Sequence, residues 1–202
     1  MGQEKVPRLF LHSCCAPCSS YVLEYLRQYF RITVFYYNPN ISMQSEYWKR
    51  VEEQKRLIAT YNRMDADTMY PIHIVEGDYK PECFFEIAKG LEQCPEGGER
   101  CFACYRLRLE ETAKQAVAGE YDYFATTLTI SPLKNAAKLN EIGEELAKEY
   151  GVCWLPSDFK KRNGYKRSIE LSQEYDLYRQ DYCGCVYSKM EREQQKQDKK
   201  LL

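Results

Sequence analysis

The sequence predicts an α/β fold in which a parallel sheet of about five strands carries helices on both faces. Short apolar runs alternate five times with longer segments whose apolar residues recur every three or four positions. The run at 32–37 is apolar almost throughout, as is typical of a strand buried on both sides of a parallel sheet. With 202 residues, 44% of them hydrophobic, the chain is long enough to bury the core of one such domain.

The expected strands are each followed by one helix, except the third, which is followed by two. The strands are expected at 8–11, 32–37, 72–75, 122–126 and 152–155. The helices are expected at 18–30, 44–62, 81–91, from the second half of 100–109 to about 118, 136–150 and 168–177. Gly151 ends the helix at 136–150, and the Pro and Gly residues of 94–100 indicate a flexible link. We expect residues 1–188 to form one catalytic α/β domain and residues 189–202 to form a polar tail, frayed or a solvated helix.

Composition sets bounds on where the protein works and what it binds. The net charge is −1, so a nucleic-acid partner would need a local basic patch. No run of about eighteen apolar residues is present to span a membrane, and the first residues lack the apolar core of a signal peptide. We therefore expect a cytoplasmic protein, in which ten cysteines stay reduced and serve metal or redox chemistry rather than a disulfide scaffold.

The cysteines fall into three clusters. Cys14, Cys15 and Cys18 follow the first strand, at the edge where parallel α/β sheets place their chemistry. Cys101 and Cys104 form a C-x-x-C pair at a helix start, which stabilises thiolates. At least four thiols suit either tetrahedral zinc or an iron–sulfur cube.

The third cluster is the pair Cys183 and Cys185, separated by one glycine. These thiols can bind one metal or close a strained, redox-active disulfide, and the alternative is two ordinary buried thiols. Cys153, inside an apolar run, is expected in the core. His12 lies beside the first cluster and could donate a hydrogen bond to sulfur or act as a proton source. The alternative is a hydrogen-bonded structural histidine.

Four segments, 12–18, 100–109, 127–134 and 178–188, together resemble the QueH-type epoxyqueuosine reductases, in order and over nearly the whole chain. The resemblance implies a HUP-like (Rossmann-like) α/β fold and the last step of queuosine biosynthesis. In that step an epoxide at the wobble nucleotide of tRNA is reduced by two electrons to an alkene, without cobalamin and with an external electron donor of the reductase or ferredoxin type.

The resemblance also implies cofactor ligands. It assigns a [4Fe-4S] cluster to Cys14, Cys15, Cys101 and Cys104, and it makes Cys183 and Cys185 either a redox pair or ligands of a second iron. The need for a Lewis acid that binds the epoxide oxygen adds Cys18 as a further candidate ligand of that second iron. Spacing alone leaves a choice open, because Cys15 and Cys18 form their own C-x-x-C and could replace Cys14 and Cys15 in the cluster.

A basic segment is the candidate contact with tRNA. Lys160, Lys161, Arg162, Lys166 and Arg167 surround Gly164, and Tyr165 offers a ring for stacking on an unpaired base. The alternative is an ordinary solvated loop. Lys134 and Arg179 lie in the segments that carry the resemblance and are candidates for phosphate or substrate contacts.

Two other functions are alternatives for a sequence of this kind. An ATP-using tRNA-modifying enzyme would need a Gly-rich phosphate loop after the first strand, and 13–17 contains no glycine. A zinc-stabilised, non-catalytic tRNA-binding module is the remaining alternative.

Overall fold

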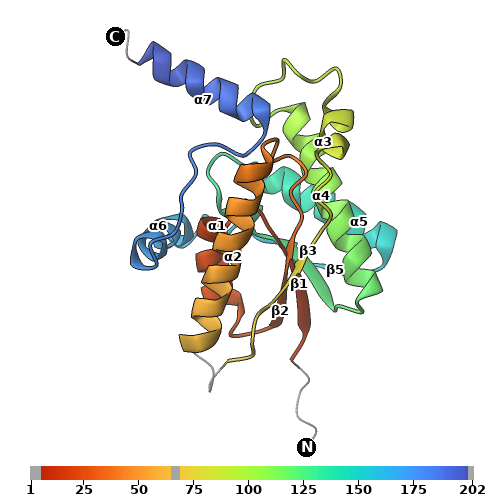
Figure 1. Ribbon diagram of the computed structural model, residues 1–202. Helices are drawn as coiled ribbons and strands as arrows, with labels where there is room; N and C mark the ends of the chain where they lie inside the picture. Colours follow the sequence, from red (N-terminus) through yellow and green to blue (C-terminus); the bar gives the residue numbers. More distant parts are fainter. Residues whose placement is uncertain (1–5, 65–68, 200–202) are drawn as a thin grey trace, which may run out of the picture.

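The computed structural model describes residues 6–64 and 69–199 and confirms the predicted α/β, Rossmann-like architecture (Figure 1). Within these residues five parallel strands form one sheet in the order β3-β2-β1-β4-β5. They are β1 (Arg8–Ser13), β2 (Arg31–Tyr36), β3 (His73–Glu76), β4 (Tyr123–Thr126) and β5 (Cys153–Trp154).

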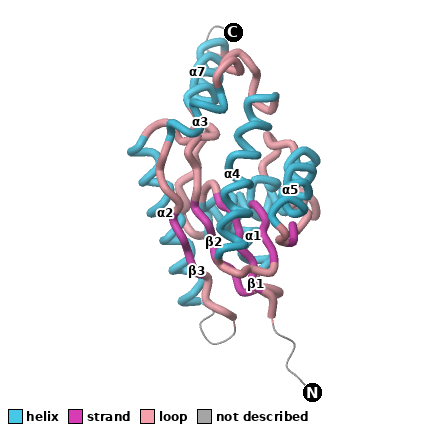
Figure 2. Tube along the Cα trace, turned by 90° about the vertical axis from the view of Figure 1, so that its right-hand side faces the viewer, coloured by secondary structure: helices cyan, strands magenta, loops and turns pink. Residues whose placement is uncertain are grey.

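Helices cover both faces of the sheet, as the alternation of strands and helices predicted (Figure 2). On one face lie α1 (Ala16–Leu26) and α2 (Gln44–Met64), with α6 (Gly164–Glu174) packed against α1. On the other lie α4 (Glu99–Ala118) and α5 (Ala136–Tyr150), with α3 (Pro81–Ala88) packed against α4. The 3-10 turn η1 (Thr127–Ile130) follows β4, and α7 (Val186–Asp198) ends the described chain.

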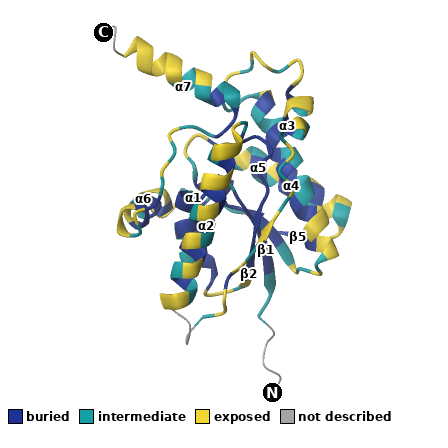
Figure 3. Cartoon of the chain, in the orientation of Figure 1, coloured by how far each residue is buried: buried dark blue, intermediate teal, exposed yellow. Residues whose placement is uncertain are grey.

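Successive side chains of β1 point to opposite faces of the sheet, and a separate hydrophobic core lies on each face. Leu9 and Leu11 pack with α1 and α2 residues such as Leu23. Phe10 points to the opposite face and packs with Leu109 and Leu139 of α4 and α5. β1 is the central strand of the sheet and is buried on both faces, so its carboxyl end lies in the middle of the molecule (Figure 3).

Several boundaries differ from the predicted ones. Helix α1 begins two residues early because Pro17 suits a first helical turn, where its missing N–H costs no hydrogen bond. Helix α6 also begins early, at Gly164, where a Cβ atom would collide with the carbonyl oxygen of Phe159. The prediction that Cys153 is a core residue was wrong: β5 is a two-residue edge strand, and Cys153 is exposed while Trp154 faces inward.

The strand order creates a switch point between β1 and β4. From β1 the chain runs outward to β2 and β3, then returns to the other side of β1 through β4 and β5. Ligand crevices of doubly wound sheets lie where the connections diverge in this way, at the carboxyl ends of the strands. Here that position is occupied by the loop after β1, which carries Cys14 and Cys15, and by η1 after β4.

Candidate metal centre and substrate cavity

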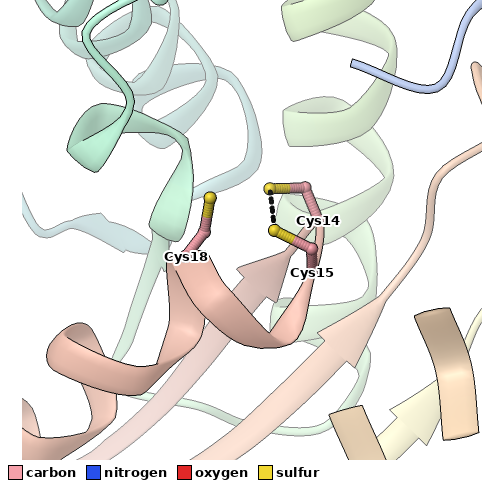
Figure 4. A group of neighbouring side chains, drawn as sticks. All are labelled: Cys14, Cys15 and Cys18. Carbon is pink, nitrogen blue, oxygen red and sulfur yellow. Dashed lines mark hydrogen bonds between the residues drawn. The ribbon is translucent and has the colours of Figure 1, made fainter. Parts of the chain in front are cut away.

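The three cysteines after β1 converge at the switch point. The Sγ atoms of Cys14, Cys15 and Cys18 all lie within 4.8 Å of one another, and across residues 6–64 and 69–199 no other group of three or more Cys, His, Asp or Glu ligand atoms meets this spacing (Figure 4). The Cys14 and Cys15 sulfurs are 3.8 Å apart. Two thiolates on one tetrahedral metal, with metal–sulfur bonds of about 2.3 Å, lie about 3.8 Å apart. This group can therefore bind a metal.

Local backbone structure explains the convergence. Cys14 lies in the short loop between β1 and α1, Cys15 is the residue immediately before α1, and Cys18 lies in the first turn of that helix. The amide dipoles of a helix N-terminus favour negative charge there.

Of the three thiols, Cys15 has the lowest pKa and loses its proton most readily. The pKa of Cys15 falls well below its usual value because Cys14 and Cys18 donate hydrogen bonds to it, with added help from the Arg50 charge and the Gln180 side chain. Cys14, which donates its proton to Cys15, has its pKa raised to about 11. The pKa of Cys18 also rises, through its neighbouring thiols and burial. Proton loss therefore begins at Cys15, and a bound metal would favour loss of the other two protons.

The other predicted cysteines form a second group beside the first. Cys101 and Cys104 on α4 and the pair Cys183 and Cys185 line one narrow pocket. Cys183 also lines the larger cavity above the Cys14 group, so the two groups adjoin through this residue. All ten cysteines of the chain are free thiols. Burial raises the pKa of Cys104 to about 11 and that of Cys185 to about 12.

The larger cavity, which we call the main cavity, has a volume of about 530 Å³. Cys14, Cys15 and Cys18 line it together with residues of η1, of α6, of the 179–183 loop and of α7. Lys134 and Arg179, the candidates for phosphate or substrate contacts, line it, and Tyr165 does so from α6. A cavity of this size accommodates a ligand of small-molecule dimensions, such as a nucleoside.

Some side chains of the predicted basic segment form ion pairs with other described residues, and others do not. Lys160 pairs with Asp158 and donates to the carbonyl of Thr129, and Arg167 pairs with Glu24. Lys161, Arg162 and Lys166 are exposed and form no ion pair with any described residue.

His12 is a structural residue. It is fully buried, with Nε2 3.0 Å from the Tyr37 carbonyl and Nδ1 2.9 Å from the Thr126 hydroxyl. The carbonyl can only accept, so Nε2 carries the proton. The Thr126 oxygen accepts from the Leu128 amide and is free to donate to Nδ1. Burial, and then the Arg108 charge, lower the pKa of His12 to about 3, so the ring is neutral.

Buried arginines near the cysteines were not predicted as site residues. Arg50, Arg100 and Arg108 have exposed fractions of 2%, 2% and 1%. Arg50 pairs with Glu46 and Arg100 with Glu191. The sequence could have indicated Arg108 as a site residue, because helical spacing places positions 101, 104 and 108 on one face of α4. Buried positive charge fits a site that binds thiolates and their metal, whose combined charge is negative.

The fold and the site together define the class: a doubly wound α/β protein with three clustered thiols at its switch point that could bind a metal. A family model described as "Epoxyqueuosine reductase QueH" matches residues 9–191. Three curated proteins named epoxyqueuosine reductase QueH are similar to this chain. The Streptococcus pyogenes protein is 47% identical over 90% of this chain and 70% of its own length. The Staphylococcus epidermidis protein is 46% identical over 91% of this chain and 77% of its own length. The Thermotoga maritima protein is 34% identical over 91% of this chain and 91% of its own length. The chain belongs to the QueH family of epoxyqueuosine reductases.

Proposed function

We propose that this protein is an epoxyqueuosine reductase that completes queuosine at the wobble nucleotide of tRNA. The substrate epoxide takes up two electrons and two protons, its two C–O bonds break, a C=C bond forms, and the oxygen leaves as water. Membership of the QueH family carries the proposal. The juxtaposition of seven thiols with a nucleoside-sized cavity at the switch point supports it.

The proposed cofactor is a [4Fe-4S] cluster held by Cys14, Cys15, Cys101 and Cys104, which would supply electrons to the bound epoxide. Cys183 and Cys185 would act as a dithiol or, with Cys18, as ligands of a second iron. The tight grouping of Cys18 with Cys14 and Cys15 keeps the alternative open in which Cys18 is a cluster ligand. The zinc-stabilised binding module remains the competing function, since three clustered thiols also suit zinc.

The chain's own residues would bind and orient the RNA. Lys134 is buried beside Glu96, with 3.0 Å between Nζ and Oε1, so it presents a positioned ammonium at the cavity wall. Arg179 is held by the Ser172 hydroxyl. We propose that these two side chains contact the substrate. Lys161, Arg162 and Lys166, which form no ion pair with a described residue, would bind phosphates at and just before the start of α6. Lys160 and Arg167, which do form such pairs, would contribute less.

The proposal extends to the protein's surroundings. An external donor of the reductase or ferredoxin type would supply the electrons, the reaction would need no cobalamin, and the protein would work in the cytoplasm. Residues 1–188 would form the catalytic domain. No helix in 6–64 or 69–199 has the length and apolarity needed to cross a bilayer.

Single Cys→Ala variants test the ligand assignment. Purified anaerobically, the wild-type protein should carry four or more irons, absorb broadly near about 400 nm and convert epoxyqueuosine-containing tRNA to queuosine with a chemical reductant and no cobalamin. Cys14→Ala, Cys15→Ala, Cys101→Ala and Cys104→Ala should each lose the cluster. Cys153→Ala, at an exposed thiol of β5, is the matched control and should keep it.

Other outcomes are equally decisive. A full iron and sulfide count in Cys14→Ala, with loss in Cys18→Ala, would replace Cys14 by Cys18 in the cluster. A colourless wild-type protein that holds one zinc and leaves the epoxide intact would establish the binding-module alternative.

A further inference from the structure

Helix α7 is held over the main cavity although its second half, residues 191–198, contains no apolar side chain. Only Ser188 of this helix is buried, and every residue from 193 to 199 is exposed (Figure 3). In Figure 1 the helix projects from the end of the molecule, away from the sheet. A helix that is polar all round gains little from packing on the protein, so its position calls for another contact.

The first turns of α7 fix its direction. The Cys185 sulfur accepts from the amide of Ser188 at 3.3 Å, and Glu191 binds buried Arg100 at 3.1 Å. Tyr187 packs on the small core around Phe84. These contacts aim the exposed remainder of the helix along the mouth of the main cavity.

One face of the exposed part is basic and lines that cavity. Arg192, Lys196 and Lys199 all line it. Their spacing of four and then three residues places them on one side of the helix. The Nε atom of Arg192 is buried without a hydrogen-bond partner. Lys196 has one ion pair, to Asp181, between side chains that are 65% and 59% exposed, and such exposed pairs contribute little.

We propose that this basic face binds the phosphodiester backbone of the RNA beside the nucleotide that enters the main cavity. The inference rests on the proposed function. If one nucleoside fills the cavity, the phosphates on either side of it must lie at the mouth, where α7 stands. Arg192 and Lys199 are about 10.5 Å apart along the helix axis. Phosphates of one strand follow one another about every 3.4 Å in a stacked helix, so the face spans more than one.

The positive charge of this face of α7 complements the negative charge of RNA phosphates. Two acidic side chains line the main cavity, and both are already paired with lysines: Glu96 with Lys134 and Asp181 with Lys196. Contacts from Lys and Arg to phosphate fix the position of RNA without reading its bases. Specificity for the modified base would then reside in the cavity, and α7 would contribute affinity and orientation.

The test measures binding of an anticodon stem-loop RNA carrying epoxyqueuosine, by fluorescence anisotropy at several salt concentrations. The variant R192Q/K196Q/K199Q should bind at least about tenfold more weakly at low salt. Its slope of log K against log salt should shrink by about 2, since each single-strand phosphate contact contributes about 0.7. Iron content, visible spectrum and helical circular dichroism should match those of the wild type.

The control variant K89Q/K114Q/K148Q removes the same charge from exposed sites on or beside α3, α4 and α5 that do not line the cavity. It should bind like the wild type. An unchanged salt slope in the α7 variant would overturn the inference, and so would an equal loss in the control. Failure of the proposed function is distinguishable from failure of this inference. In that case the wild-type protein itself would leave the epoxide unreduced, whatever the binding measurements on the α7 variant show.

Discussion

At the scale of single residues, Arg108 is an unusual feature of the site. It is buried, its Nε donates to the Cys104 carbonyl at 3.1 Å, and its Nη1 has no hydrogen-bond partner. None of the ion pairs among the described residues joins it to a carboxylate, unlike Arg50 and Arg100. A buried cation without a counter-charge is costly unless an anion is supplied. In this pocket the anions available are the cysteine thiolates and any cluster that they hold.

Replacing Arg108 should therefore change stability and metal binding in opposite directions. We expect Arg108→Met to raise the free energy of unfolding of the metal-free protein by about 1–3 kcal/mol, as when a buried charge is replaced by an apolar group. The same variant should retain less iron. Urea unfolding of the reduced apoprotein and iron analysis measure the two effects. Arg108→Lys, which keeps the charge, is the control and should lose less iron. A destabilised apoprotein with full iron content would show that Arg108 is purely structural.

At the scale of elements, helix α2 positions the loop that carries Cys183. Glu53 accepts from the amide of Tyr178 at 2.6 Å, and Arg56 donates to the carbonyl of Asp176 at 2.7 Å. Arg50 donates to the carbonyl of Cys183 at 3.1 Å. One helix thus anchors the loop at three points, because Glu and Arg side chains at 50, 53 and 56 recur on one side of α2.

The Glu53 contact should make this anchoring sensitive to pH. The pKa of Glu53 is lowered by Arg56 and by the Tyr178 amide. A lowered folded-state pKa stabilises the protein above the unfolded value of about 4.3, and this contribution is lost as pH falls through the folded value. Glu53→Gln should cost about 1 kcal/mol at pH 7 and nothing in strong acid.

Urea unfolding of both proteins across this pH range measures the difference. Glu86→Gln, which removes an exposed pair with Lys89, is the control and should have little effect at any pH. A loss of stability that persists unchanged in acid would mean that the Glu53 charge is not what anchors the loop.

At the scale of the whole molecule, the metal centre would join three parts of the chain. The thiols come from the β1–α1 loop, from α4 and from the loop before α7, and the last is fastened mainly by side chains of α2. A ligand that binds only the folded state stabilises it in proportion to the logarithm of its concentration over its dissociation constant.

Removal of the metal should lower the melting temperature of the wild-type protein by about 5 °C or more, as expected for a loss of a few kcal/mol in a chain of this size. Amide exchange should accelerate most in residues 176–188. The melting temperature of Cys14→Ala should not respond to the same chelator treatment. Uniform acceleration across the sheet would contradict the idea that the metal mainly fastens this loop.

Much of the fold was predictable because its signals are local. The apolar runs of β1 and β2 and the periodicity of α2 and α5 depend on neighbouring residues, and each was found with small errors at its ends. The candidate cysteines were equally visible, since close spacing within 14–18 and 101–104 is a property of the chain itself. Sequence reasoning could not separate Lys161 from Lys160, because their difference lies in partners such as Asp158 and the Thr129 carbonyl.

By itself, therefore, the sequence determined the fold class, the family and the set of thiols. Tertiary structure alone decided which of those thiols meet, that α7 turns a basic face toward their cavity, and that Arg108 is buried among them without a carboxylate. The physical reason is that secondary structure follows from contacts a few residues apart. A site at a switch point instead depends on strand order and on the packing of segments that lie more than a hundred residues apart in the chain.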